Sequence, residues 1–331
     1  MAQRPSCAAA TWRWRESNPR PIRFTPPPTI SKLSRKLVNI LGLYLTSVLI
    51  WGSTWLAITF QFGAVPPAVS VVYRFALAGL ILLAWARTKG LPLRFSLGEH
   101  LWMALQGFLL FGINYLCVYL AETEITSGLV AVVFSLLVIL NIAGARLFFG
   151  TPLKPFTMLG AALGIGGVVL VFLPEIGRGT GRGDPTLGIA FALGGALTAS
   201  LGNIVAYRNH GRGLPVVQMN TFGMIYGALF VAVFALVTRQ PFLFDWSPRY
   251  LISLVYLAVF GSILAFGAFL ALLGRIGADR AGYVTVAIPI VALLFSGLFE
   301  GLRWHMSLVL GILLCLAGNV AVLWGRGTPQ R

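Results

Sequence analysis

Apolar runs of about 20 residues recur along this chain between residues 38 and 325. A helix of that length crosses the hydrocarbon core of a bilayer, which is about 30 Å thick. Of the 331 residues, 57% are hydrophobic and only 10% are charged, whereas a soluble domain carries about 25% charged residues. The sequence therefore predicts an all-α polytopic membrane protein.

Ten transmembrane helices are predicted, and many of their ends coincide with a proline or a short polar segment. The predicted helices cover residues 38–60, 67–87, 99–122, 125–149, 154–174, 186–208, 215–238, 249–273, 279–300 and 303–325.

The second half of the chain repeats the glycine pattern of the first half. At a constant offset of 151 positions, three glycines of the first half correspond to three of the second: Gly150, Gly160 and Gly167 to Gly301, Gly311 and Gly318. Such a recurrence indicates an internal duplication. Each half holds five predicted helices, an odd number, so the second half must enter the membrane from the opposite side. The predicted architecture is therefore two inverted five-helix repeats, as in many transporters.

This organisation sets the expected domain boundaries. The first repeat is expected at residues 38–174 and the second at 186–325, with a Gly-rich linker at 175–185 and a cytoplasmic tail at 326–331. Residues 1–37 are rich in Arg and Pro and contain no apolar run. Two interpretations of this segment stay open: a disordered basic tail, or a spurious extension from a gene start assigned too far upstream.

Positive charges lie mostly on one side of the predicted topology. From Lys32 onward, the segments on the N-terminal side carry 14 Lys and Arg residues, and the loops on the other side carry five. Because positive residues are enriched in cytoplasmic segments, both termini are expected in the cytoplasm. The net charge of +16 then reflects topology and contact with anionic lipid, and we expect no nucleic-acid partner.

Five segments resemble the EamA type of the drug/metabolite transporter superfamily. They are LIWGSTWLAITF (49–60), VVYRFALAGLILL (71–83), TSGLVAVVFSLLVIL (126–140), GAALGIGGVVLVF (160–172) and AGYVTVAIPIVALLFSGLFEGLRW (281–304). The resemblance covers about residues 40–325. It implies a secondary transporter of small metabolites or amino acids, often an exporter, in a bacterial inner membrane. It also implies a central cavity lined by the first four helices of each half, with the fifth and tenth helices at the periphery.

One feature that the resemblance implies is missing from the first repeat. Family members often carry a proline in the fourth helix and a glutamate in the following loop, where this chain has Val138 and Thr151. The second repeat keeps Pro289, and its Glu300 falls two positions early. Pro289 should kink its helix, either as a hinge for alternating access or as a passive bend.

Arg74 lies inside an otherwise apolar segment, VVYRFALAGL. A charge within a membrane helix is costly and usually functional. The side chain could snorkel toward the lipid headgroups, or it could face a cavity and hold a carboxylate, a phosphate or Glu122. The resemblance places a basic residue in this helix and so favours the cavity.

Further polar and aromatic residues form stripes on the predicted helices. Such stripes must face protein or water rather than lipid, so each residue is expected to line the substrate cavity or to bond between helices. The candidates are Trp51, Trp55, Asn114, Tyr115, Tyr119, Ser200, Asn203, Tyr207, Asn220 and Tyr283. Glu122 and Glu300 lie near predicted helix ends and are candidates for proton coupling, with solvated helix caps as the alternative.

The motifs predict few partners. No metal site or cofactor is expected, because the sequence has no CxxC or HExxH motif. GAALG (160–164) and GILLC (311–315) indicate close helix packing, within the chain or across a homodimer face. The expected partners are a small-molecule substrate and the lipid bilayer. The leading hypothesis is a secondary transporter that exports its substrate by alternating access. The alternative is a membrane-embedded enzyme or a lipid-handling protein, which the missing catalytic motifs disfavour.

Overall fold

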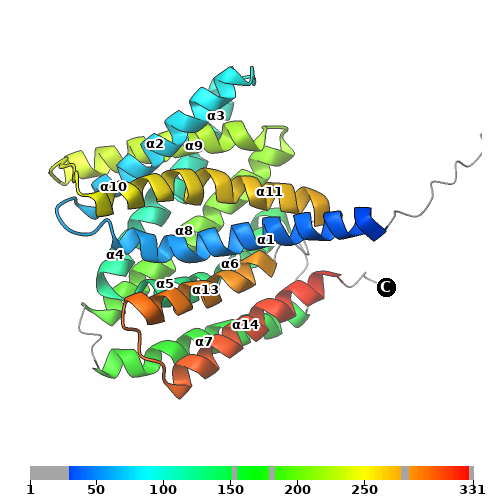
Figure 1. Cartoon of the computed structure of the whole chain (residues 1–331), viewed down its shortest axis with the longest axis vertical. Coiled ribbons are helices and arrows are strands. Elements are labelled where there is room, and N and C mark those ends of the chain that lie inside the picture. Colours follow the sequence, from blue (N-terminus) through cyan, green and yellow to red (C-terminus); the bar gives the residue numbers. More distant parts are fainter. Residues whose placement is uncertain (1–29, 151–154, 179–182, 277–282, 328–331) are drawn as a thin grey trace, which may run out of the picture. The chain divides into compact units, whose positions relative to one another are not determined.

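A computed structural model describes residues 30–150, 155–178, 183–276 and 283–327 of the chain. Within these ranges the chain forms helices and short connections and no β-strand. Residues 39–331 form one compact unit, which is described below (Figure 1). The first helix begins at Ile30, before the predicted start at residue 38, and the preceding part of the predicted tail lies outside the described residues.

The helices follow the predicted order along the chain. The described elements are α1 (Ile30–Thr59), α2 (Pro67–Thr88), α3 (Leu97–Gly107), η1 (Phe108–Ile113), α4 (Asn114–Glu124), α5 (Ser127–Phe134), α6 (Leu137–Phe149), α7 (Pro155–Arg178), α8 (Pro185–Gly211), α9 (Val216–Val237), α10 (Pro248–Val255), η2 (Tyr256–Leu264), α11 (Ala265–Ile276), α13 (Tyr283–Phe299) and α14 (Met306–Gly327).

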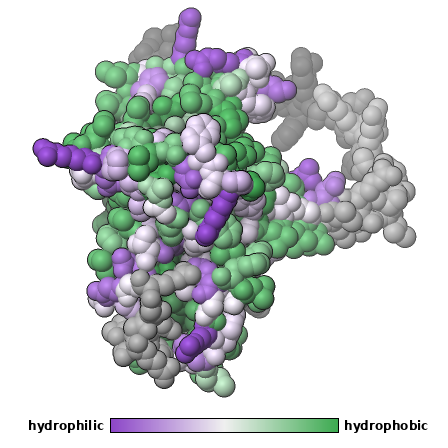
Figure 2. Space-filling model, turned by 60° about the vertical axis from the view of Figure 1, so that its left-hand side comes forward, coloured by the Kyte–Doolittle hydropathy of each residue, from purple (hydrophilic) through white to green (hydrophobic). Residues whose placement is uncertain are grey.

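Eight helical stretches of the described chain are long and apolar enough to cross a membrane. Two further apolar stretches, Tyr283–Phe299 and Met306–Val322, are shorter. Large apolar side chains such as Leu97, Leu147 and Leu298 are more than three-quarters exposed, and Figure 2 shows hydrophobic residues over much of the visible face. Lipid rather than water suits this surface, so the protein is an α-helical multi-pass membrane protein.

Two of the long helices contain π-helical segments. η1 joins α3 to α4, and η2 joins α10 to α11. Asn114, which directly follows η1, donates a side-chain hydrogen bond to the carbonyl of Leu110 at 3.0 Å, and Ser262 of η2 donates to that of Leu257 at 2.9 Å. Segments of this kind are frequent at functional sites. Ser262 of η2 contacts Arg74, the residue around which the candidate site is built.

Glycines bring α7 and α14 into backbone contact, and the two helices pair at one edge of the bundle (Figure 1). A Cβ added at Gly160 would lie 2.5 Å from the carbonyl oxygen of Gly318, and one added at Gly318 would lie 2.6 Å from that of Gly160. Gly167 and Gly311 face each other in the same reciprocal way, each at 2.6 Å. The predicted close packing is therefore confirmed within the chain. The two motifs are used between α7 and α14, and a homodimer stays a prediction.

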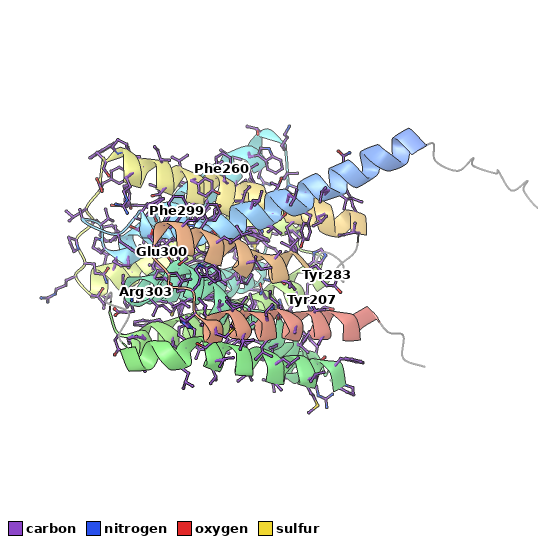
Figure 3. The ribbon with its side chains drawn as sticks, turned by 60° about the horizontal axis from the view of Figure 1, so that its bottom comes forward. Tyr207, Phe260, Tyr283, Phe299, Glu300 and Arg303 are labelled. Atoms are coloured by element: carbon purple, nitrogen blue, oxygen red, sulfur yellow. The ribbon has the colours of Figure 1, made fainter. Side chains whose placement is uncertain are left out.

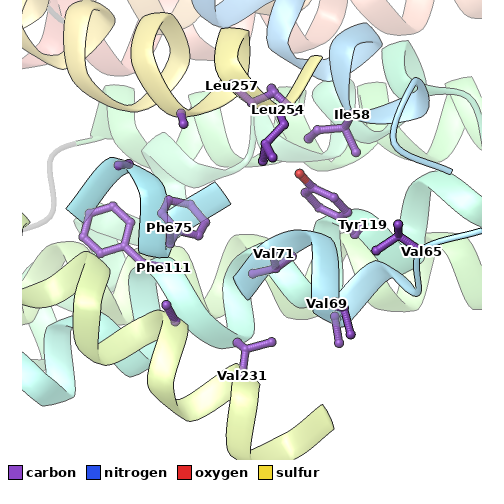
Figure 4. Packing of buried hydrophobic residues seen from close by; sticks show 14 of the residues in the cluster. Ile58, Val65, Val69, Val71, Phe75, Phe111, Tyr119, Val231, Leu254 and Leu257 are labelled. Atoms are coloured by element: carbon purple, nitrogen blue, oxygen red, sulfur yellow. The ribbon is translucent and has the colours of Figure 1, made fainter. Parts of the chain in front are cut away.

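The other main contacts also join the two halves of the chain. α2 packs against α9, α4 against α8, and α5 against α13. Three of the pairs, α2–α9, α5–α13 and α7–α14, join helices that hold the same place in the two predicted halves. The largest buried cluster lies at the α2–α4–α9–α10 contact and includes Phe75, Phe111 and Tyr119 (Figure 4).

Candidate functional site

Arg74 is buried in the interior of the bundle. Its side chain is 1% exposed, which is incompatible with snorkelling to the headgroups. Its Nε atom donates to the hydroxyl of Ser262 at 3.4 Å. The guanidinium carbon lies 4.6 Å from the centre of the Tyr115 ring and 5.2 Å from that of Phe75, so two aromatic faces offset part of the cost of burying the charge.

Tyr119 extends this site along α4. Its hydroxyl donates to the Oε1 atom of Gln61 at 2.5 Å, and it also interacts with Arg74. Figure 4 shows the hydroxyl pointing toward Ile58 and Leu254. Glu122, one turn further along α4, is 2% exposed and lies within electrostatic range of the same hydroxyl. A buried cation and a buried carboxylate therefore flank Tyr119.

Two pockets lie at the end of the bundle where α1 ends and α10 begins. The first has a volume of about 400 Å³, and its lining includes Ser53, whose hydroxyl lies 2.6 Å from that of Tyr256. The second has a volume of about 330 Å³, and its lining includes Glu122 and Glu300. Three residues line both pockets: Leu56, Phe60 and Arg249. Together the two pockets, named the α1–α10 pockets, mix aromatic surface with charges of both signs.

Glu300 has a structural contact in addition to its place in the second of the α1–α10 pockets. Its carboxylate accepts from the backbone N–H of Ser127 at 3.2 Å and from the Ser127 hydroxyl. Ser127 is the first residue of α5, where backbone N–H groups have no partner within the helix. The carboxylate that follows α13 thus caps α5 and ties the two helices together at this end.

A third pocket, of about 120 Å³, lies between α1, α5, α6 and α13. Trp55 and Pro289 line it, and Trp55 packs edge-on against Phe134 at 5.0 Å. Pro289 is buried inside α13. The structure therefore brings the predicted hinge and one of the two predicted tryptophans together.

Several predicted cavity residues make bonds between helices. Trp51 donates from its indole nitrogen to the carbonyl of Gly261 at 3.2 Å. Asn203 donates to Asn141 at 3.4 Å, and Asn220 accepts from Gln106 at 3.4 Å. These contacts match the interhelical alternative for each residue.

Three further candidates differ widely in exposure. Ser200 is buried beside Gly144, where an added Cβ would lie 3.8 Å from its hydroxyl. Tyr207 is 67% exposed and packs against Phe149. Tyr283 is 36% exposed and lies at the opposite end of α13 from Glu300 (Figure 3).

The site includes residues that were not predicted from the sequence, among them Gln61, Ser262, Phe60 and Arg249. Gln61 and Ser262 are neutral polar residues in apolar surroundings, and that pattern is the signal that could have pointed to them. Among the residues that the structure describes, no group of three or more His, Cys, Asp or Glu side chains could hold a metal ion.

Comparison with known proteins gives a family match in each half of the chain. The model of the EamA-like transporter family matches residues 39–173 and again residues 186–324. A solved structure described only as "Crystal structure of protein" aligns with a TM-score of 0.62 at 19% identity, over 88% of this chain and 98% of that chain. At that identity the likeness shows the fold alone.

Curated relatives are similar over most of their length. The chain is 27% identical to "Uncharacterized inner membrane transporter YedA" of Escherichia coli (strain K12), over 79% of this chain and 83% of that protein. It is 23% identical to "Protein PagO" of Salmonella typhimurium, over 88% and 95% of the two chains. It is 25% identical to "Uncharacterized transporter YvbV" of Bacillus subtilis, over 81% and 86%.

Proposed function

The chain belongs to the EamA-like transporter family of the drug/metabolite transporter superfamily, and from this membership we propose that it is a secondary transporter of the inner membrane. In this proposal it exports small metabolites or amino acids by alternating access. The relatives named as transporters support transport, and the name of YedA as an inner membrane transporter supports the location.

The burial of Arg74 is the observation that carries the proposal. The arginine belongs to α2 in the first half, and its polar contact, Ser262, belongs to η2 in the second half. Its Nη1 atom has no hydrogen-bond partner in the described part of the chain. A buried charge with a free donor, placed where two halves meet, suits a solute site that opens as the halves move relative to one another.

Two features support inverted repeats around that site. The family model matches the chain twice, and corresponding helices of the two predicted halves pack against each other. In the proposed cycle the α1–α10 pockets connect Arg74 with the periplasmic side, where an exported solute leaves, and Pro289 is the hinge at the third pocket. Glu122 is the proposed site of proton coupling, because it lines the second of the α1–α10 pockets and also acts electrostatically on Tyr119. Glu300 is a weaker candidate for proton coupling, because its carboxylate caps α5.

Solute flux tests this function directly. Purified protein in proteoliposomes, loaded with a panel of labelled amino acids and short carboxylic acids, should release at least one solute faster than protein-free liposomes do. The alternative, a membrane-embedded enzyme or a lipid-handling protein, predicts conversion of a solute or movement of labelled lipid without solute flux. That result would reject the proposal.

We also expect both termini to face the cytoplasm, because the charge bias of the loops sets the orientation. An alkaline phosphatase domain, which is active only in the periplasm, should stay inactive when fused after Arg331. The same domain inserted after Gln240, in the connection between α9 and α10, should be active and serves as the control. Activity of the Arg331 fusion would overturn the topology and, with it, the inversion of the repeats.

A further inference from the structure

Two buried hydrogen-bond donors next to Tyr119 lack partners among the described residues. They are the Nη1 atom of Arg74 and the Nε2 atom of Gln61. Both side chains are 1% exposed. A buried donor without an acceptor costs free energy that a bound acceptor would recover. Two such donors, one of them charged, therefore point to a ligand with acceptor oxygens.

The surroundings fix both donors in place. The Tyr119 hydroxyl donates to the amide oxygen of Gln61, and this leaves the amide nitrogen of Gln61 to face another group. Arg74 is held through Nε by Ser262 and lies over the ring of Tyr115. Neither contact uses Nη1, so the guanidinium is oriented while one of its donors stays available.

We infer that Gln61 and Arg74 together hold the carboxylate group of the transported solute, with Tyr119 positioning Gln61. This inference rests on the proposed transport function. Arg74 is the cation at this point, and the Glu122 carboxyl group lies within electrostatic range of the same tyrosine hydroxyl. One cation with an acidic side chain nearby balances the charge of a bound monoanion better than that of a bound dianion. The site therefore takes a carboxylate rather than a phosphate monoester.

Thermal stability of the purified full-length chain in detergent tests the inference, because a ligand raises apparent stability when it binds only the folded state. Sodium acetate should raise the unfolding midpoint above that in sodium chloride at equal ionic strength. Gln61→Leu should raise the apparent Kd for acetate about tenfold or more, the loss expected for a hydrogen bond to a charged group. Gln240→Leu changes a glutamine in the α9–α10 connection and should leave the acetate response intact.

Gln61→Glu separates binding from a structural role. The new side chain still accepts from Tyr119, but an oxygen replaces the donor nitrogen, so the acetate response should disappear. A normal response in Gln61→Glu, or no response in the parent protein, would overturn the inference, and stronger stabilisation by sodium phosphate would overturn the choice of carboxylate. All of these are binding measurements, so solute flux in proteoliposomes can persist if the inference fails, and the two proposals fail separately.

Discussion

Replacing Arg74 with leucine should reduce transport by about tenfold or more while leaving the protein folded. The reduction follows because the buried guanidinium, with its available Nη1 atom, is the proposed contact for the solute, and a hydrogen bond to a charged group contributes about 1.5–3 kcal/mol. Leucine suits the interior of a membrane helix better than arginine does, so expression should be at least equal to that of the parent. The measurement is solute flux normalised to folded protein.

Arg74→Lys refines the same prediction. Lysine keeps the charge but loses the planar fork that grips a carboxylate and lies over the Tyr115 ring, so its flux should be intermediate. Arg212 is exposed, and Arg212→Leu is the control that should transport normally. Unchanged flux in Arg74→Leu would remove the binding role and leave the arginine a purely structural group.

Gly167→Ala should destabilise the protein by about 1–3 kcal/mol, the usual cost of forcing an extra carbon into a packed contact. The new Cβ would lie 2.6 Å from the carbonyl oxygen of Gly311 and 2.8 Å from the backbone nitrogen of Cys315. Because the Gly311 contact is backbone, the two helices must move apart. The measurement is the unfolding midpoint of purified protein in detergent.

Gly166→Ala is the matched control for this prediction. It places the same methyl group one residue earlier on α7, where nothing lies within 4 Å. Its midpoint should equal or slightly exceed that of the parent, since alanine is the better helix former. Equal midpoints for the two variants would mean that α7 and α14 do not pack through these glycines.

Some features of this structure can be predicted from the sequence, and others cannot. The apolar runs predict the helices because a bilayer requires internally bonded backbone. The glycine spacing predicts close packing, but the partner helix comes from the tertiary fold. Arg74 stands out as a charge in an apolar run. Gln61 stands out less, because a neutral amide at a helix end is also typical of a loop.

The stripe on α8 shows why periodicity alone cannot define a cavity. Ser200 and Tyr207 are seven positions apart and share a helical face. Ser200 is buried beside Gly144 of α6, whereas Tyr207 reaches Phe149, the last residue of α6, and is 67% exposed. The helical period determines which way a side chain points. Whether another helix covers that side chain depends on how far the neighbouring helix extends.

Alternating access requires that Arg74 can be reached in turn from each side of the membrane. A single cysteine at Ser262→Cys, with Cys7, Cys117 and Cys315 replaced by serine or alanine, reports on it, because Ser262 is 2% exposed and contacts Arg74. A chain that retains only Cys315, which is buried between α7 and α14, is the control and should resist labelling. A membrane-impermeant thiol reagent should label Ser262→Cys in both right-side-out and inside-out vesicles. Labelling from one side only, or from neither, would contradict alternating access at this site.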